Sequence, residues 1–232
     1  MLLYHPDLGQ ISITFRRNSH RVTARWKNGI LALSVPVGIS RDEIARVLED
    51  FIPRLFSSRP TLKYTPDQTL TFPLASFRIA RQTHMPDRIL GLAALPMSSL
   101  EVGSSLDFQN DTTTRAISDM LCRLARRVAP EVLLLHARSI ADRLGRHPVE
   151  WKVSRGHRIL GQCSASGVIS LSYVLLFLPE ELCDYVIAHE IAHLTELNHS
   201  PAFHTLLNSY LGGRERQLVA RLRAYTWPVL RS

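Results

Sequence analysis

The sequence is poor in cysteine and lysine, and it lacks long hydrophobic runs. No stretch approaches 18 uninterrupted apolar residues, and the amino terminus has no basic region followed by an apolar run, so we expect neither a membrane span nor a secretion signal. The cysteines Cys122, Cys163 and Cys183 form no Cys-x-x-Cys pair. This excludes a disulfide framework and a cysteine-based zinc site, and it favours a cytoplasmic location with thiols that are small packing residues.

The positive charge is carried almost entirely by arginine. Only three of the 28 lysine and arginine residues are lysines, and the formal net charge is +8. No glycine-rich phosphate loop or nucleic-acid-binding signature accompanies the arginines. The densest groups lie within 16–25, 123–127 and 214–223, and each spacing fits the solvated face of a strand or helix. Binding to nucleic acid is therefore an alternative that the charge permits but that no motif supports.

The first part of the chain has the patterns of β-structure with one helix. Alternating residues predict strands over 11–15, 22–26 and 30–35, with a turn at Asn28-Gly29 before the last strand. Ser40 and Glu43 have the spacing of a capping box, which predicts an amphipathic helix through Leu55. Short strands and turns should follow to residue 108, the clearest at 69–74 and 76–79. We expect residues 1–110 to form an amino-terminal β-rich region.

The second part of the chain is predominantly helical. Two helices are predicted over 114–128 and 130–144, which meet near Pro130 because proline interrupts a helix interior. Strands are expected at 149–153 and 168–171, one of them at the edge of a functional cleft, and a closing amphipathic helix at 214–225. Residues 111–232 would then form a second domain, or pack with the first part as one globular unit. The fold class that these patterns predict is α+β.

The segment His189-Glu190-Ile191-Ala192-His193 has the spacing of a metal site that performs hydrolysis. On a helix, residues four apart lie on one face, about 6 Å apart along the axis, so His189 and His193 can bind one ion. Glu190 can then reach a metal-bound water and accept its proton. A helix is expected here, because Pro179 and two glutamates precede apolar residues at helical spacing. The ion that suits this donor set is Zn²⁺.

A third ligand requires the chain to turn after the helix, and His199 follows such a turn. Asn198 tolerates the left-handed conformation that ends many helices, and Ser200-Pro201 has the form of an N-cap followed by a first-turn proline. His199 would therefore lie between two helices. His204 and Glu215 are the alternative third ligands, although His204 is better suited to packing or to supporting the site.

The residues around this motif resemble the YgjP-like metallopeptidase domain, a relative of the SprT-like zinc proteases. The similarity covers Asp184–Leu194, then Asn198-His199-Ser200 and Phe203. It extends upstream to Gly161–Ser164 and Gly167–Leu171, and to the segment Arg21–Pro36. The resemblance implies a zincin-like catalytic domain, with His189, His193 and His199 as zinc ligands and Glu190 as catalytic acid and base.

The chain departs from the family pattern close to the motif. Ile159 and Leu160 replace the usual arginine and tryptophan, and Gln162 replaces serine. Arg158 cannot simply substitute for the arginine, because a shift of one residue along a strand points the side chain to the other face. His204 stands where the family usually has tryptophan. The chain is thus expected to be a divergent member of the family.

The hypothesis favoured by the motif and the resemblance is a zinc metalloprotease that acts on protein or peptide substrates. Two alternatives stay open: a metal-dependent nucleoside triphosphate pyrophosphatase, and a non-catalytic, zinc-stabilised module that binds nucleic acid. A peptidase also needs a donor for the oxyanion that forms on the attacked carbonyl. The candidates are Tyr173, Tyr185, Tyr210, His157 and Arg158. The sequence does not indicate an oligomeric state.

Overall fold

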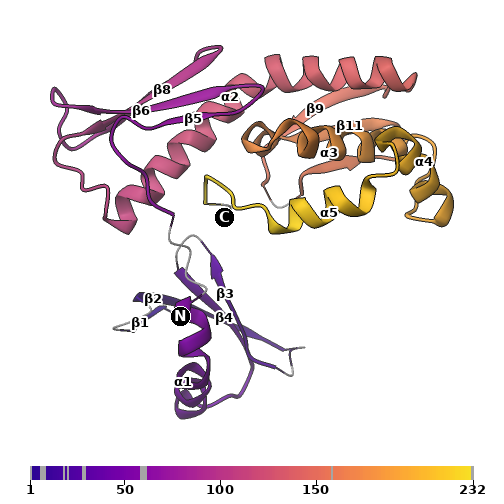
Figure 1. Ribbon diagram of the computed structural model, residues 1–232. Coiled ribbons are helices and arrows are strands. Elements are labelled where there is room, and N and C mark those ends of the chain that lie inside the picture. Colours follow the sequence, from indigo (N-terminus) through magenta and orange to yellow (C-terminus); the bar gives the residue numbers. More distant parts are fainter. Residues whose placement is uncertain are drawn as a thin grey trace. The chain divides into compact units, whose positions relative to one another are not determined.

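The computed structural model describes residues 2–5, 9–17, 19, 21–27, 30–57, 62–157 and 159–230. Packing divides the chain into two compact units, one that extends from the amino terminus to Lys63 and one that comprises Tyr64–Val229. We expected a boundary near residue 110. The division falls earlier because strands between residues 64 and 110 pack against the long helix of the second unit, as Figure 1 shows.

The first unit contains a four-stranded sheet and one helix. The sheet order is β1 (Leu2–His5), β2 (Gly9–Arg16), β4 (Ile30–Pro36) and β3 (Thr23–Lys27), and the helix is α1 (Arg41–Ser57). The backbone N–H of Glu43 donates to Ser40 Oγ at 3.2 Å, which confirms the predicted N-cap. The turn expected at Asn28-Gly29 lies outside the described residues. Alternating apolar residues of β2 and β4 form the core with α1: Ile11, Ile13, Leu31, Leu33, Val35, Ile44 and Leu48.

The second unit is built along α2 (Asp111–Leu144), a continuous helix of 34 residues that includes Pro130. The prediction of two separate helices is therefore wrong. An interior proline costs roughly 3 kcal/mol, but Ala129 and Leu133 on either side of it are 0% exposed. Burial of one leucine-sized side chain contributes about 1.5–3 kcal/mol. Because buried residues continue on both sides of Pro130, packing outweighs the lost hydrogen bond.

One sheet of the second unit packs against α2. Its order is β5 (Thr69–Thr71), β6 (Ser76–Gln82), β8 (Met97–Gly103) and β7 (Ile89–Leu92), and β6 and β8 are parallel. The strand expected at 69–74 is present only over 69–71, and the one expected at 76–79 lies within β6. Strands β7 and β8 occupy a stretch with no clear sequence pattern. Phe77 of β6 lies 5.1 Å, between ring centroids, from Phe177 in the buried 3₁₀ helix η1 (Tyr173–Phe177). This contact joins the sheet to the rest of the unit.

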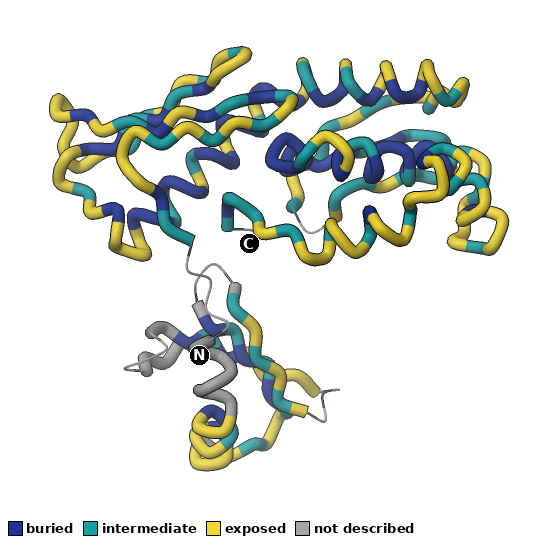
Figure 2. Tube along the Cα trace, in the orientation of Figure 1, coloured by how far each residue is buried: buried dark blue, intermediate teal, exposed yellow. Residues whose placement is uncertain are grey.

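The other sheet supports the remaining helices. Its central strand, β11 (Val168–Ser172), is antiparallel to β10 (Gly161–Cys163) and parallel to β9 (Glu150–Ser154). Helix α3 (Glu180–Ala192) packs against α2, β10 and β11, and both α4 (Pro201–Leu211) and α5 (Glu215–Ala224) contact α3. Figure 2 shows that α3 is largely buried and α5 largely exposed. The fold is α+β, with a β-rich amino-terminal segment, as predicted.

Candidate metal centre

Helix α3 carries the central residues of the predicted motif. It follows Pro179 and has Glu180 and Glu181 in its first turn, where negative charge complements the positive end of the helix dipole. Apolar residues along the helix are buried, including Ile187 and Ile191 at 0% exposure. The helix is therefore anchored both before and within the motif, and the residues one turn apart are held at a constant spacing.

The chain turns sharply between α3 and α4. Backbone N–H groups of Leu194 and Thr195 donate to carbonyls three residues earlier, at 3.0 and 3.1 Å, which tightens the end of α3. Asn198 does not adopt the left-handed conformation that we expected, since Asp67 is the one described non-glycine residue with positive φ. The turn closes instead with a bond from the Ser200 N–H to the Asn198 carbonyl at 2.8 Å. Ser200 then caps α4, as predicted.

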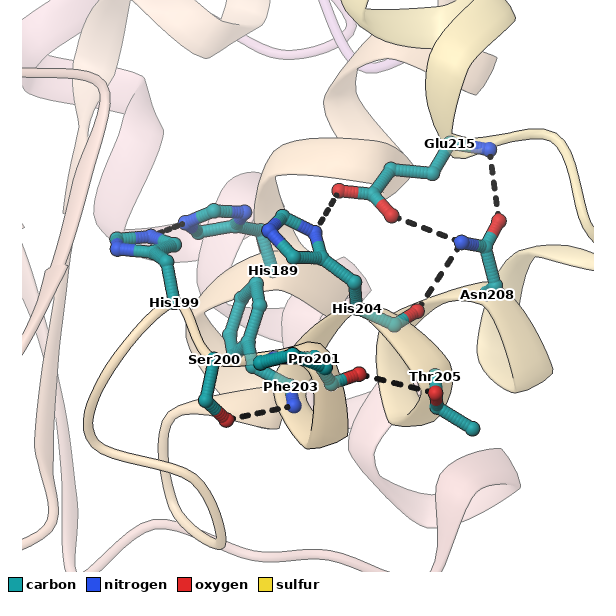
Figure 3. A network of polar contacts seen from close by, with 9 residues as sticks. All are labelled: His189, His199, Ser200, Pro201, Phe203, His204, Thr205, Asn208 and Glu215. Atoms are coloured by element: carbon teal, nitrogen blue, oxygen red, sulfur yellow. Dashed lines mark hydrogen bonds and ion pairs between the residues drawn. The ribbon is translucent and has the colours of Figure 1, made fainter.

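The turn brings three histidines together. The ligand atoms of His189, His193 and His199 all lie within 4.8 Å of one another. The Nε2 atoms of His189 and His199 are 3.0 Å apart, and a dashed line joins these nitrogens in Figure 3. The alternative third ligands, His204 and Glu215, do not belong to this cluster. The structure thus places the sequence-predicted ligands at one point and the two alternatives outside it.

Phe203 packs against all three histidine rings. The sequence did not identify it as functional, because it appeared there only as part of the family pattern. Its side chain is 0% exposed. Its ring is stacked on that of His193 at 4.5 Å, and it meets the rings of His189 and His199 edge to face at 4.9 and 4.8 Å. One rigid aromatic ring therefore restricts the orientations of all three imidazoles.

The cluster fits a metal ion of the size of zinc. Two nitrogens bound to a tetrahedral zinc ion lie about 3.3 Å apart, close to the observed 3.0 Å between His189 and His199. His193 Nδ1 lies 2.9 Å from the carbonyl oxygen of Glu196, which only accepts, so Nδ1 carries the hydrogen and Nε2 retains its lone pair. The donor set therefore leaves lone pairs available to an ion.

The electrostatic surroundings favour the neutral imidazoles that metal binding needs. Burial, which has the largest effect, and the nearby imidazoles of His193, His199 and His204 together lower the pKa of His189 to about 4. Burial also lowers the pKa of His199, with a contribution from His193. Both rings are consequently uncharged at neutral pH, which is the form that coordinates metal ions.

Glu190 lies beside the cluster and is almost completely buried. It is 6% exposed, and burial raises its pKa to about 7, while a hydrogen bond from the backbone of Cys163 opposes the rise. A bound cation would also oppose it, by favouring the carboxylate. A carboxyl group that titrates near neutral pH can both accept and return a proton. The surroundings of Glu190 therefore suit a general base.

Strand β10 is the edge of the sheet that lies against Glu190. A Cβ atom added to Gly161 would lie 2.5 Å from Glu190 Cγ and 2.6 Å from Oε1, so only glycine admits the carboxylate at this position. Gln162 is exposed, because alternate residues of a strand face opposite sides. Its departure from the family pattern therefore falls on the face away from Glu190. Of the two strands expected at 149–153 and 168–171, β11 is central and β9 lies at the edge opposite to β10. Neither of them is the edge strand beside Glu190.

A polar network holds His204 next to the cluster, as Figure 3 shows. His204 Nδ1 lies 2.7 Å from Glu215 Oε1, and Asn208 Nδ2 donates to Glu215 Oε2 at 2.8 Å. The N–H of Glu215 donates to Asn208 Oδ1 at 3.2 Å. Both carboxylate oxygens of Glu215 are thus engaged by neighbours in α4. The role suggested for His204, support rather than ligation, agrees with this arrangement.

A cleft of about 840 Å³ opens beside His189. It lies among residues of α3, α4 and α5 and of the turn that joins the last two helices. Its lining consists of Tyr185, His189, His204, Asn208, Gly213, Glu215, Arg216, Val219, Ala220 and Arg223. The cleft is adjacent to the histidine cluster and large enough for side chains of a bound peptide.

The candidate oxyanion donors have different surroundings. Tyr173 is 0% exposed, and its hydroxyl lies 2.7 Å from His157 Nδ1, so these two groups bind each other. Tyr210 lines a separate pocket beside Glu181. Tyr185 lines the cleft next to His189, with its ring centroid 6.0 Å from that of His189. Arg158 lies outside the described residues. Of the four described candidates, Tyr185 is the one that shares a cleft with the cluster.

The α+β fold and the histidine cluster at the end of a buried helix define a zincin-like metallopeptidase domain. The model of the YgjP-like metallopeptidase domain matches residues 19–224, so the chain belongs to the YgjP-like metallopeptidase family. It is accordingly a metal-dependent peptidase, a hydrolase with protein or peptide substrates.

One solved structure resembles part of the chain. The crystal structure of the metallopeptidase zymogen abylysin of Pyrococcus abyssi matches with 26% sequence identity and a TM-score of 0.34, over 38% of this chain and 89% of that chain. None of the curated proteins matches. Within the described ranges, no helix combines the length and apolarity needed to cross a bilayer.

Proposed function

We propose that the protein is a zinc-dependent peptidase in which His189, His193 and His199 bind the ion and Glu190 is the general base. The observation that supports this most directly is the convergence of three imidazoles within 4.8 Å beside a glutamate that is 6% exposed. Catalytic zinc sites use three protein ligands and keep a fourth position open. Among the described residues the cluster consists of three histidines and no fourth ligand, which matches that requirement.

The residues of the chain have distinct tasks in this reaction. Bound zinc would supply the Lewis acidity that makes a water molecule acidic and polarises the peptide carbonyl. Glu190 accepts a proton from the attacking water and transfers it to the leaving amine. The bond from the Cys163 backbone and the close approach of Gly161 fix the carboxylate in place. Phe203 keeps the three imidazoles in one arrangement.

The test is to separate metal binding from proteolysis. Wild-type protein should contain about one zinc per chain by elemental analysis and should cleave an unfolded protein such as reduced casein. The variant Glu190→Gln should keep the zinc but lose about 10²–10⁴-fold in rate, since that is the usual contribution of a general base. His199→Ala should lose both zinc and activity. A metal-free wild type, or a Glu190→Gln variant that cleaves normally, would refute the proposal.

The proposed place of action is the cytoplasm. All three cysteines are free, and Cys122 and Cys183 are buried. Free thiols persist in a reducing compartment, which supports this location. Measurement of the thiol state of the protein in intact cells would test it.

A further inference from the structure

The arginines around α5 fall into two groups with different partners. Arg214 Nη1 lies 3.1 Å from Glu181 Oε1, and Arg221 pairs with the other oxygen of the same carboxylate. Together with Arg221, which has the larger effect, Arg214 holds the pKa of Glu181 below its usual value. Arg216 and Arg223 line the cleft beside His189 instead. Among the described residues, neither of these two arginines has an acidic side chain within ion-pair distance.

The two unpaired arginines mark the length of the cleft along α5. Arg216 and Arg223 are seven positions apart, which corresponds to about 10 Å along a helix axis. Val219 and Ala220 also line the cleft, and they lie between the arginines in the sequence. An extended peptide covers about 10 Å with three residues. The α5 wall of the cleft thus combines two guanidinium groups with a short apolar strip.

The single carboxylate in the cleft lining does not cancel this positive charge. Glu215 Oε1 is engaged by His204 and Oε2 by Asn208, and its side chain is only 12% exposed. The side chains of a neutral peptide would leave Arg216 and Arg223 without a partner. A carboxylate, in contrast, matches the paired N–H donors of a guanidinium group. The net charge of +8 adds a long-range attraction for acidic ligands.

We propose that this cleft is a substrate-binding subsite for acidic side chains, so that the peptidase prefers bonds with a glutamate or aspartate within about three residues of the cleaved position. This inference rests on the proposed peptidase function and specifies its substrates. A peptide is favoured over nucleic acid because the cleft adjoins His189 and contains apolar residues between its two free cations.

The experiment measures binding without turnover. Glu190→Gln protein is titrated into two fluorescent eight-residue alanine–leucine peptides that differ only in a central glutamate or glutamine. The acidic peptide should bind about fivefold more tightly, since the single glutamate can form one partly exposed ion pair, which contributes modestly. The preference should decrease with added salt. Replacement of Arg216 and Arg223 by glutamine in this background should abolish it.

The opposite face of the same helix provides the matched control. Replacement of Arg214 and Arg221 by glutamine removes the same charge but should preserve the preference, because these residues are paired with Glu181. Equal affinity for both peptides would overturn the inference. So would tighter binding of a single-stranded oligonucleotide through Arg216 and Arg223.

Failure of the subsite and failure of the peptidase are distinguishable. Cleavage of casein by the wild type together with equal peptide affinities refutes the subsite alone. Absence of cleavage together with an arginine-dependent peptide preference refutes the peptidase and retains the cleft as a binding site.

Discussion

Gly161→Ala is the most specific perturbation of the proposed base. The added Cβ would lie 2.5, 2.6 and 2.8 Å from Cγ, Oε1 and Cδ of Glu190, whereas ordinary contacts begin at 3.4 Å. Subtraction of 2.5 from 3.4 gives a displacement of at least about 0.9 Å. The flexible glutamate rather than the strand should move, and the carboxylate would leave the position that suits proton transfer.

The expected effect is large on catalysis and small on stability. A misplacement of about 1 Å costs about 100-fold in rate, equivalent to about 2.7 kcal/mol of transition-state stabilisation. Gly161 has no positive φ, so alanine introduces no backbone strain. The unfolding free energy should therefore change by less than about 1 kcal/mol. The assay compares kcat for peptide cleavage, zinc content and urea unfolding of the variant and the wild type.

Gly156→Ala is the control, because a Cβ at this position meets nothing within 4 Å and its φ is also ordinary. It should retain wild-type kcat. Gly161→Ala combined with Glu190→Gln should be no slower than Glu190→Gln alone, since both changes remove the same interaction. Wild-type activity in Gly161→Ala would refute the proposal that Glu190 acts as the base from the position it has in the structure. Loss of zinc would show instead that the change disrupts the ligands.

Three further predictions concern Phe203, Pro130 and the cysteines. Phe203→Ala should lower the unfolding free energy by about 3–5 kcal/mol. It should also lower zinc affinity by about 10–100-fold in a chelator competition, and Phe203→Leu should lower both quantities less. Unchanged zinc affinity would show that the ring does not orient the imidazoles. Pro130→Ala, at an exposed site in α2, should raise the unfolding free energy by about 2 kcal/mol in urea titrations, whereas a decrease would mean that the helix requires the proline. Burial raises the pKa of Cys122 and Cys183, and only the thiolate reacts, so alkylation near neutral pH should be slow in the native protein and fast after unfolding. Half-buried Cys163, whose pKa is also raised, should react first; rapid native labelling of Cys183 would contradict its burial.

Local patterns made several features predictable from the sequence. The spacing of His189 and His193 depends only on helical periodicity, and the Ser200 cap depends on residues within one turn. The capping box at Ser40 is local in the same way. Asn198 is the exception, because the tendency of its side chain to allow a left-handed backbone is weak, and the hydrogen bond from Ser200 closes the turn without it.

The continuity of α2 shows where local rules fail. Pro130 removes one hydrogen bond, and this local cost predicts a break. Ala129 and Leu133 are nevertheless fully buried within the second unit. A sequence pattern shows that such residues are apolar but not how many neighbours surround them, so the compensating energy could not be assessed in advance.

The sequence by itself determined the helix with His189, Glu190 and His193, because these residues interact within one turn. The tertiary structure decided what surrounds them: Phe203 against the three imidazoles, Gly161 against Glu190, and two arginines along the cleft that have no acidic partner among the described residues. Each of these contacts joins different elements of the chain. Their distances depend on how helices and strands pack, and packing is set by the whole buried core rather than by any local pattern.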